Sequence, residues 1–269
     1  AMNPENPVAD VAADLARVFA DAGFSADGIA GHLGPEYTEA LHRGEPEAVA
    51  LGASGDSRLD HLIRIFVLHE HVPATLLSDV LGARLATQLL DSGVALTDDH
   101  GTVYVAYDIR PHVIVGKNRV VFSDVDASLV DHVPGPEHVL GVGSASLSLL
   151  HSTPTTPVSS VLDLGTGSGV QVLGQLDSAE RIVATDVHER ALELARATVA
   201  AADAEKQVEL RQGSWFEPVQ HERFDRIVAN PPFVVGLPEV GHVYRDSGLN
   251  LDGASAVSYT HLRAHETLR

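Results

Sequence analysis

The sequence contains no cysteine, which excludes a disulfide bond and a thiolate metal site. Long apolar runs are also missing: no segment approaches the roughly 20 residues of a membrane-spanning helix, and no signal-peptide pattern opens the chain. Positive charge is scarce, with 18 lysines and arginines against 37 acidic residues and a formal net charge of -19. These absences are consistent with a cytoplasmic protein, and the negative charge disfavours nucleic-acid binding except where basic residues are locally concentrated.

A glycine-rich turn is the most informative pattern that is present. Residues 158–164 predict a short buried strand, and Gly165, Gly167 and Gly169 follow it at alternate positions. Glycine allows positive φ and close approach of a ligand. Asp163 lies among apolar neighbours, where a lone carboxylate is costly unless something pairs with it. The turn therefore predicts a ligand site, with a turn that binds nothing as the alternative.

Two common ligand-binding turns do not match this pattern. A dinucleotide-binding loop has its third glycine one place after Gly169, where this chain has Val170. A phosphate-binding P-loop needs Gly-Lys-Ser or Gly-Lys-Thr, and no lysine is near. What remains is an Asp-x-Gly-x-Gly-x-Gly turn.

The segments after the turn continue as alternating strands and helices. Residues 181–186 predict a second strand ending in Asp186, at the place where a carboxylate can hold two ribose hydroxyls. Residues 188–202 predict a helix, and residues 208–211 and 224–230 two further strands. Polar residues at the ends of successive strands predict an α/β fold with an open, doubly wound, Rossmann-like sheet.

Together these motifs resemble those of class I S-adenosylmethionine (SAM) methyltransferases. Residues 163–169 are similar to the first motif of that family. Residues 230–233, Asn-Pro-Pro-Phe, are similar to the fourth motif of the members that methylate planar nitrogens, such as the HemK-type and small-domain enzymes. The resemblance covers residues 158 to about 253. It implies SAM as the cofactor.

The resemblance leaves the substrate open between two classes. One is a nucleic-acid base, adenine-N6 or guanine-N2, in rRNA, tRNA or DNA. The other is a glutamine amide in a translation release factor. A SAM-binding regulator without transferase activity is the alternative function.

The resemblance also assigns the site residues, and the chemistry explains their type. A conjugated nitrogen is a poor nucleophile, so acceptors for its two hydrogens, the Asn230 side-chain oxygen and the Pro231 carbonyl, would stabilise the charge that develops on it. The expected catalytic residues are Asn230, Pro231, Pro232 and Phe233. The expected cofactor-binding residues are Asp163, Gly165, Gly167, Gly169, Asp186, Ser214, Trp215 and Asn230.

One position departs from the family pattern. Many relatives have an Asp after the third strand that accepts from the adenine amino group, and Ser214 occupies that place here. Ser214 can still form a hydrogen bond. Trp215 and Phe216 are expected either to pack on the adenine ring or to belong to the core.

Residues 1–123 predict a mainly helical N-terminal domain. Two short helices separated by Gly82 and β-like segments between residues 94 and 122 make a winged-helix arrangement one candidate. The second of these helices offers only Arg84 as a basic residue, which favours a substrate-recognition or packing role over DNA reading. The basic cluster of this region comprises Arg110, Lys117 and Arg119.

The histidines of this region suggest a metal site at first sight. His69 and His71 are two positions apart, and His61 precedes them. Helical residues at i and i+2 point to different sides, and no second ligand set with zinc spacing follows. No metal site is therefore expected.

The remaining boundaries complete the expected organisation. Residues 124–157 are a connector, in which residues 140–146 form either a lip over the methionine end of SAM or a linker. Residues 158–256 are a partial methyltransferase domain, and residues 257–269 resemble a translated sequencing adapter and are left out of the fold. In this family the fourth strand lies inside the sheet, so the chain as given is expected to be poorly soluble or to associate through that edge.

Overall fold

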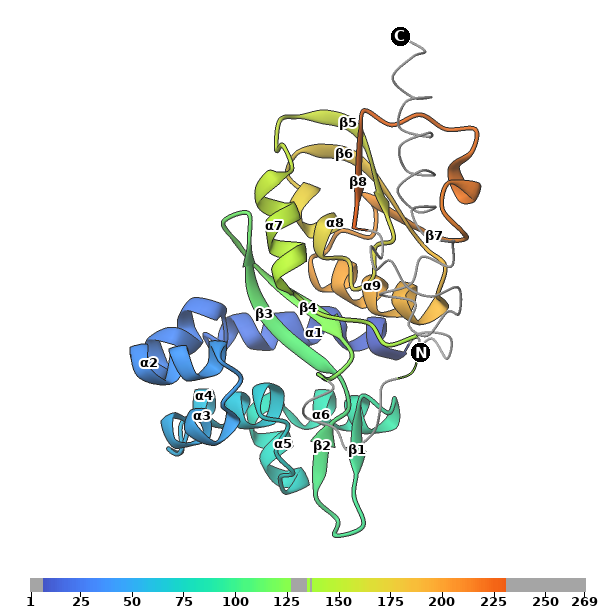
Figure 1. Ribbon diagram of the computed structural model, residues 1–269. Coiled ribbons are helices and arrows are strands. Elements are labelled where there is room, and N and C mark those ends of the chain that lie inside the picture. The colour runs from blue at the N-terminus through green and yellow to red at the C-terminus, as the bar shows by residue number, and fades with distance from the viewer. Residues whose placement is uncertain (1–6, 127–134, 136, 231–269) are drawn as a thin grey trace. The chain divides into compact units, whose positions relative to one another are not determined.

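The computed structural model describes residues 7–126, 135 and 137–230 (Figure 1). The chain divides into two compact units. Unit 1 comprises Ala1–Val125 and Arg196–Ala204, and unit 2 comprises Asp126–Ala195 and Glu205–Arg269. Across the described ranges, no helix has both the length and the apolar character that crossing a membrane requires. The tail at residues 257–269 and the Pro231–Phe233 part of the fourth motif lie outside the described residues.

Unit 1 opens with two long helices. Helix α1 (Pro7–Asp21) starts at Pro7, and Val11 and Leu15 are buried on its inner face. Helix α2 (Ala26–His42) consists of two helical segments, and Gly34 with φ of 76° marks the kink between them. The further helical elements are α3 (Pro46–Gly52), α4 (Arg58–Leu62), the π-helical turn η1 (Ile63–Val67), α5 (Ala74–Leu81) and α6 (Ala83–Asp91).

The strands of unit 1 form two antiparallel hairpins. The first joins β1 (Ala95–Thr97) to β2 (Val103–Val105), and the second joins β3 (Asp108–Ile114) to β4 (Lys117–Ser123). Gly82, with φ of 85°, separates α5 from α6 as predicted. The order of two helices followed by a hairpin agrees with the winged-helix prediction, whose functional meaning stays a prediction.

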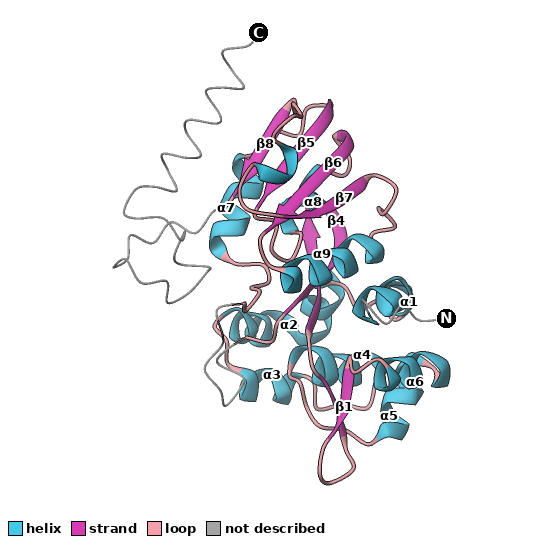
Figure 2. Cartoon of the chain, turned by 90° about the vertical axis from the view of Figure 1, so that its right-hand side faces the viewer, coloured by secondary structure: helices cyan, strands magenta, loops and turns pink. Residues whose placement is uncertain are grey.

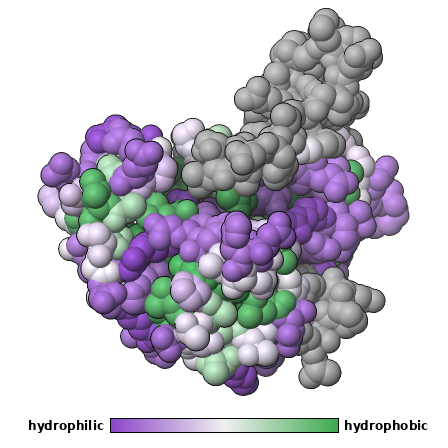
Figure 3. Space-filling model, turned by 90° about the horizontal axis from the view of Figure 1, so that it is seen from below, coloured by the Kyte–Doolittle hydropathy of each residue, from purple (hydrophilic) through white to green (hydrophobic). Residues whose placement is uncertain are grey.

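Charged and titratable side chains of unit 1 contact one another. Arg110 donates to Asp108 at 2.7 Å and to the Val67 carbonyl oxygen at 3.2 Å, so one member of the predicted basic cluster is already paired. His71 pairs with Asp98 at 2.5 Å. No group of three or more potential metal-ligating side chains occurs in the described parts of the chain. Some apolar side chains remain exposed in unit 1, including Leu51, and Figure 3 shows hydrophobic patches among hydrophilic residues on the face it presents.

Unit 2 contains a parallel four-stranded sheet. The strands are β5 (Val158–Leu164), β6 (Ala179–Asp186), β7 (Val208–Gln212) and β8 (Arg226–Ala229), in the spatial order β7-β6-β5-β8 (Figure 2). Helix α8 (Val170–Gln175) connects β5 to β6, and α9 (Glu189–Ala201) connects β6 to β7. This alternation confirms the predicted Rossmann-like α/β fold. Helix α7 (Ser144–Ser152) lies in the stretch expected to be a connector.

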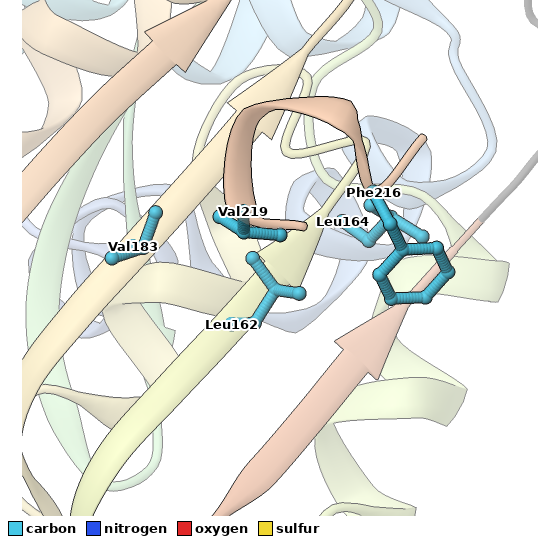
Figure 4. Packing of buried hydrophobic residues seen from close by; sticks show 5 residues of the cluster. All are labelled: Leu162, Leu164, Val183, Phe216 and Val219. Carbon is cyan, nitrogen blue, oxygen red and sulfur yellow. The ribbon is translucent and has the colours of Figure 1, made fainter. Parts of the chain in front are cut away.

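One face of this sheet is covered by the segment that follows β7. Leu162, Leu164 and Val183 from the sheet pack against Phe216 and Val219 of that segment (Figure 4). Phe216 is 5% exposed and belongs to this core, which decides between the two roles expected for it. Because side chains alternate along a strand, Asp163 points to the opposite face from Leu162 and Leu164.

Candidate active site

The order of the strands defines where the site lies. The chain runs from β5 outward to β6 and β7, and then returns to place β8 on the other side of β5. Ligands of open α/β sheets bind at the carboxyl ends of the strands, at the point where this order reverses. That point lies between β5 and β8. The residues after these two strands, together with those after β6 and β7, are therefore the candidates.

The glycine turn after β5 has the backbone that its sequence predicts. Gly165, Gly167 and Gly169 have φ values of 72°, 55° and 85°, in the left-handed region that favours glycine. A Cβ atom added to Gly165 or Gly167 would meet nothing within 4 Å, so the turn borders open space. The Gly165 and Thr166 amides both donate to the Thr185 carbonyl oxygen at 2.9 Å. These bonds attach the turn to the end of β6.

Asp186 connects three loops at the carboxyl edge of the sheet. Its Oδ2 accepts from the Gly167 amide at 2.9 Å, and its Oδ1 accepts from the His188 amide at 3.0 Å. Its backbone carbonyl oxygen accepts from the Gly213 amide at 2.9 Å. Each carboxylate oxygen has a further lone pair, so Asp186 can still accept from a ligand hydroxyl.

Asp163 is fully buried at the end of β5. Its Oδ2 accepts from the Thr166 hydroxyl at 2.7 Å, whereas its Oδ1 is buried with no hydrogen-bond partner. Burial raises the pKa of Asp163 to about 7, the Thr166 hydroxyl opposes this shift, and the charge of Asp186 adds to it. A buried oxygen without a partner is unusual in folded proteins and often marks a functional position.

The loop after β7 is packed tightly against itself. A Cβ atom on Gly213 would lie 2.4 Å from Pro218 Cγ, so no other residue fits there without movement. Arg211 donates to the Pro218 carbonyl oxygen at 3.0 Å and pairs with Glu222. Trp215, half-buried against the core, has φ of 47°, a conformation that is costly for an aromatic residue. This packing gives Ser214 and Trp215 a defined place after β7.

Asn230 directly follows β8. Ala229 is opposite Leu164 in the parallel register of β5 and β8, so Asn230 comes level with the start of the glycine turn. The structure thus brings the loops that carry Asp163, Asp186 and Asn230 to one edge of the sheet, although 67 residues separate the first from the last. Pro231, Pro232 and Phe233 are outside the described residues.

Several residues of this edge were not predicted. Thr166 is the donor to Asp163, and Thr185 is the acceptor that holds the turn. Gln171, 6% exposed, is an amide side chain within the apolar first turn of α8. The sequence does place Gln171 among apolar residues at the start of a helix. Because a buried amide needs hydrogen-bond partners, that position could have indicated its role.

Two protein families match this chain. Residues 21–106 match a domain of unknown function, DUF7059, and residues 140–246 match the methyltransferase small domain. The first match falls within unit 1. The second includes the glycine turn, Asp186, Ser214, Trp215 and Asn230.

Relatives of known name are similar to parts of the chain. The release factor glutamine methyltransferase of Aliivibrio fischeri is 40% identical over 93 residues, 34% of this chain and 32% of that protein. The one from Xylella fastidiosa (strain Temecula1) is 34% identical over 155 residues, 56% of this chain and 52% of that protein. The solved T. thermophilus 16S rRNA N2 G1207 methyltransferase (RsmC), in complex with AdoMet and guanosine, aligns with 62% of this chain and 48% of that chain, at 21% identity and a TM-score of 0.41.

The chain spans about half or less of the length of the curated relatives it matches. The family match and the sheet order nevertheless agree on the same segment, which contains the glycine turn and the strand leading to Asn230. Residues 140–246 are therefore similar to the methyltransferase small domain, and the order of their strands is that of a Rossmann-like sheet.

Proposed function

We propose that this protein transfers a methyl group from SAM to a planar nitrogen, and that a glutamine amide of a protein is its substrate. The observation that carries the proposal is the position of Asn230. It follows β8 at the point where the strand order reverses, level with the glycine turn after β5. An amide oxygen there can accept a hydrogen from the substrate nitrogen while that nitrogen faces a methyl donor held at the turn.

The residues at the sheet edge fit SAM. The open space beside Gly165 and Gly167 admits a ligand close to the backbone. Asp186, at the end of β6, has the type and place that suit the two ribose hydroxyls. The buried Asp163 oxygen without a partner is an acceptor that the protein itself leaves unused. When bound, SAM supplies a methyl group already activated by its sulfonium.

With an activated methyl group, the protein's task is mainly positioning. Asn230 would hold the nitrogen and stabilise the positive charge that develops on it, which is worth about 10²–10³ in rate for one such group in other enzymes. Pro231, Pro232 and Phe233, outside the described residues, are expected to supply the second acceptor and a flat apolar surface.

Two observations favour a protein substrate over a nucleic-acid base. Two relatives that are 34% to 40% identical to parts of the chain are named release factor glutamine methyltransferases. The chain has a net charge of -19, and Arg110 of its basic cluster is already paired with Asp108. A phosphate backbone therefore meets little free positive charge.

The test is methyl transfer from tritiated SAM by the purified full chain, offered a release factor and, separately, an RNA fraction. We expect label on a glutamine of the protein. The Asn230→Ala variant is expected to lose about 10²–10³ in kcat, with a much smaller loss of SAM affinity in calorimetry because Asn230 is also an expected cofactor contact. The matched control is Asn118→Ala, an exposed asparagine of β4, which is expected to leave both unchanged.

The alternative outcomes separate the parts of the proposal. Label on RNA alone would overturn the protein substrate. SAM binding without transfer to either fraction would favour a SAM-binding regulator. A folded protein that binds no SAM would refute the proposal altogether.

A further inference from the structure

Helix α7, which precedes β5, is attached to its unit with little apolar contact. Of its nine residues only Leu150 is buried, and Leu147 is 39% exposed. Apolar burial supplies most of the free energy that fixes a helix in place. Polar contacts therefore have an unusually large share in determining where the amino-terminal end of α7 lies.

The polar contact at that end comes from Gln171. Its Nε2 donates to the Ser146 carbonyl oxygen, in the first turn of α7, at 3.0 Å. Gln171 is only two positions beyond Gly169 and is itself buried. A single side chain thus links the start of α8, which follows the glycine turn, to residues 140–146.

A second glutamine contacts the chain shortly after the end of α7. Gln175, one helical turn after Gln171, donates to the Pro154 carbonyl oxygen at 3.4 Å, and its Oε1 accepts from Arg226 at 2.6 Å. Pro154 precedes β5 and Arg226 begins β8, so these contacts lie at the amino ends of the strands, away from the site. The two glutamines therefore share a helix and a residue type but differ in distance from the glycine turn.

We propose that Gln171 is a positioning residue that keeps residues 140–146 beside the glycine turn and thereby strengthens binding of the amino-acid end of the cofactor. This inference rests on the proposed function. If Asp186 holds the ribose at the end of β6 and the methyl group faces Asn230 beyond β5, the amino-acid end must lie near the turn after β5. The segment that Gln171 tethers to this turn is then its neighbour.

The test compares two ligands on the full chain. S-adenosylhomocysteine has the amino-acid end, and 5′-methylthioadenosine lacks it. Gln171→Met removes the donor and keeps the length of the side chain. We expect it to weaken S-adenosylhomocysteine binding about three- to tenfold in calorimetry, the effect of one hydrogen bond, and to change 5′-methylthioadenosine binding less than about twofold.

Gln175→Met is the matched control. It is expected to lower thermal stability without selective loss of either ligand. Equal weakening of both ligands by Gln171→Met would show a merely structural role and overturn the inference, as would unchanged affinity for both. A wild-type protein that binds neither ligand would overturn the proposed function and this inference with it.

Discussion

Replacing Asp163 by Asn is expected to change how stability depends on pH. Asp163 is 1% exposed, and burial raises its pKa to about 7, compared with 3.8 for an ordinary Asp. In the unfolded chain the carboxyl loses its proton at the lower pH. Proton binding therefore stabilises the folded state fully below about pH 4, and this stabilisation is lost as pH rises through about 7.

The magnitude follows from the two pKa values. Their difference corresponds to about 4 kcal/mol in the free energy of unfolding, at about 1.4 kcal/mol for each tenfold change. Between pH 5 and pH 8 the loss is about 2–3 kcal/mol, because part of it has occurred below pH 5. Asn carries no proton to lose, so the variant should lack this decline. Its amide at the unpartnered Oδ1 position costs about 1–3 kcal/mol at either pH.

Urea unfolding of the full chain at pH 5 and pH 8 measures the effect. Trp215 is the single tryptophan and lies in unit 2, so its fluorescence follows the unit that contains Asp163. The stability of Asp163→Asn relative to wild type should rise by about 2–3 kcal/mol from pH 5 to pH 8. Glu180→Gln, at an exposed site in β6, should stay within about 0.5 kcal/mol. A constant difference between Asp163→Asn and wild type would refute the reasoning.

Two backbone predictions concern stability alone. Gly213→Ala should destabilise the protein by about 1–3 kcal/mol in urea unfolding, because the new Cβ would lie 2.4 Å from Pro218 Cγ. The control Gly31→Ala lies inside α2 with open space around it and should be neutral or stabilising. Equal effects of the two substitutions would contradict the packing argument. Val115→Asn should stabilise the protein by about 1 kcal/mol in thermal unfolding, because exposed Val115 has φ of 48° in the two-residue turn between β3 and β4. The control Val113→Asn changes an exposed strand position of the same hairpin and should not stabilise the protein. Stabilisation by both substitutions would contradict the argument from turn strain.

Much of unit 2 was predictable because its signals are local. Apolar runs of strand length, each ending in a polar residue, gave β5, β6 and β8, and the glycine spacing gave the left-handed turn. The confirmed sheet follows from these patterns, since parallel strands joined by helices have few possible arrangements. The same logic predicts that Asp186 and Asn230 lie at one edge of the sheet.

What the sequence did not reveal depends on contacts between distant residues. Phe216 was open between core and ligand contact, and only its packing on Leu162 and Leu164 decides for the core. The hydrogen bond from Gln171 to Ser146 joins residues 25 positions apart, and no periodic pattern in the sequence predicts it.

The bonds of Asp186 determine which substitutions can test the site. Because Asp186 accepts from Gly167, His188 and Gly213, removing its side chain takes away two of these bonds as well as any ligand contact. An Asp186→Ala variant that fails to bind SAM would not distinguish a lost ribose contact from a displaced glycine turn. No hydrogen bond ties the Asn230 side chain to the loops in the described structure, so its removal leaves the turn and Asp186 in place. A loss of kcat that far exceeds the loss of SAM affinity in Asn230→Ala is therefore the clearer evidence for transfer chemistry at this edge.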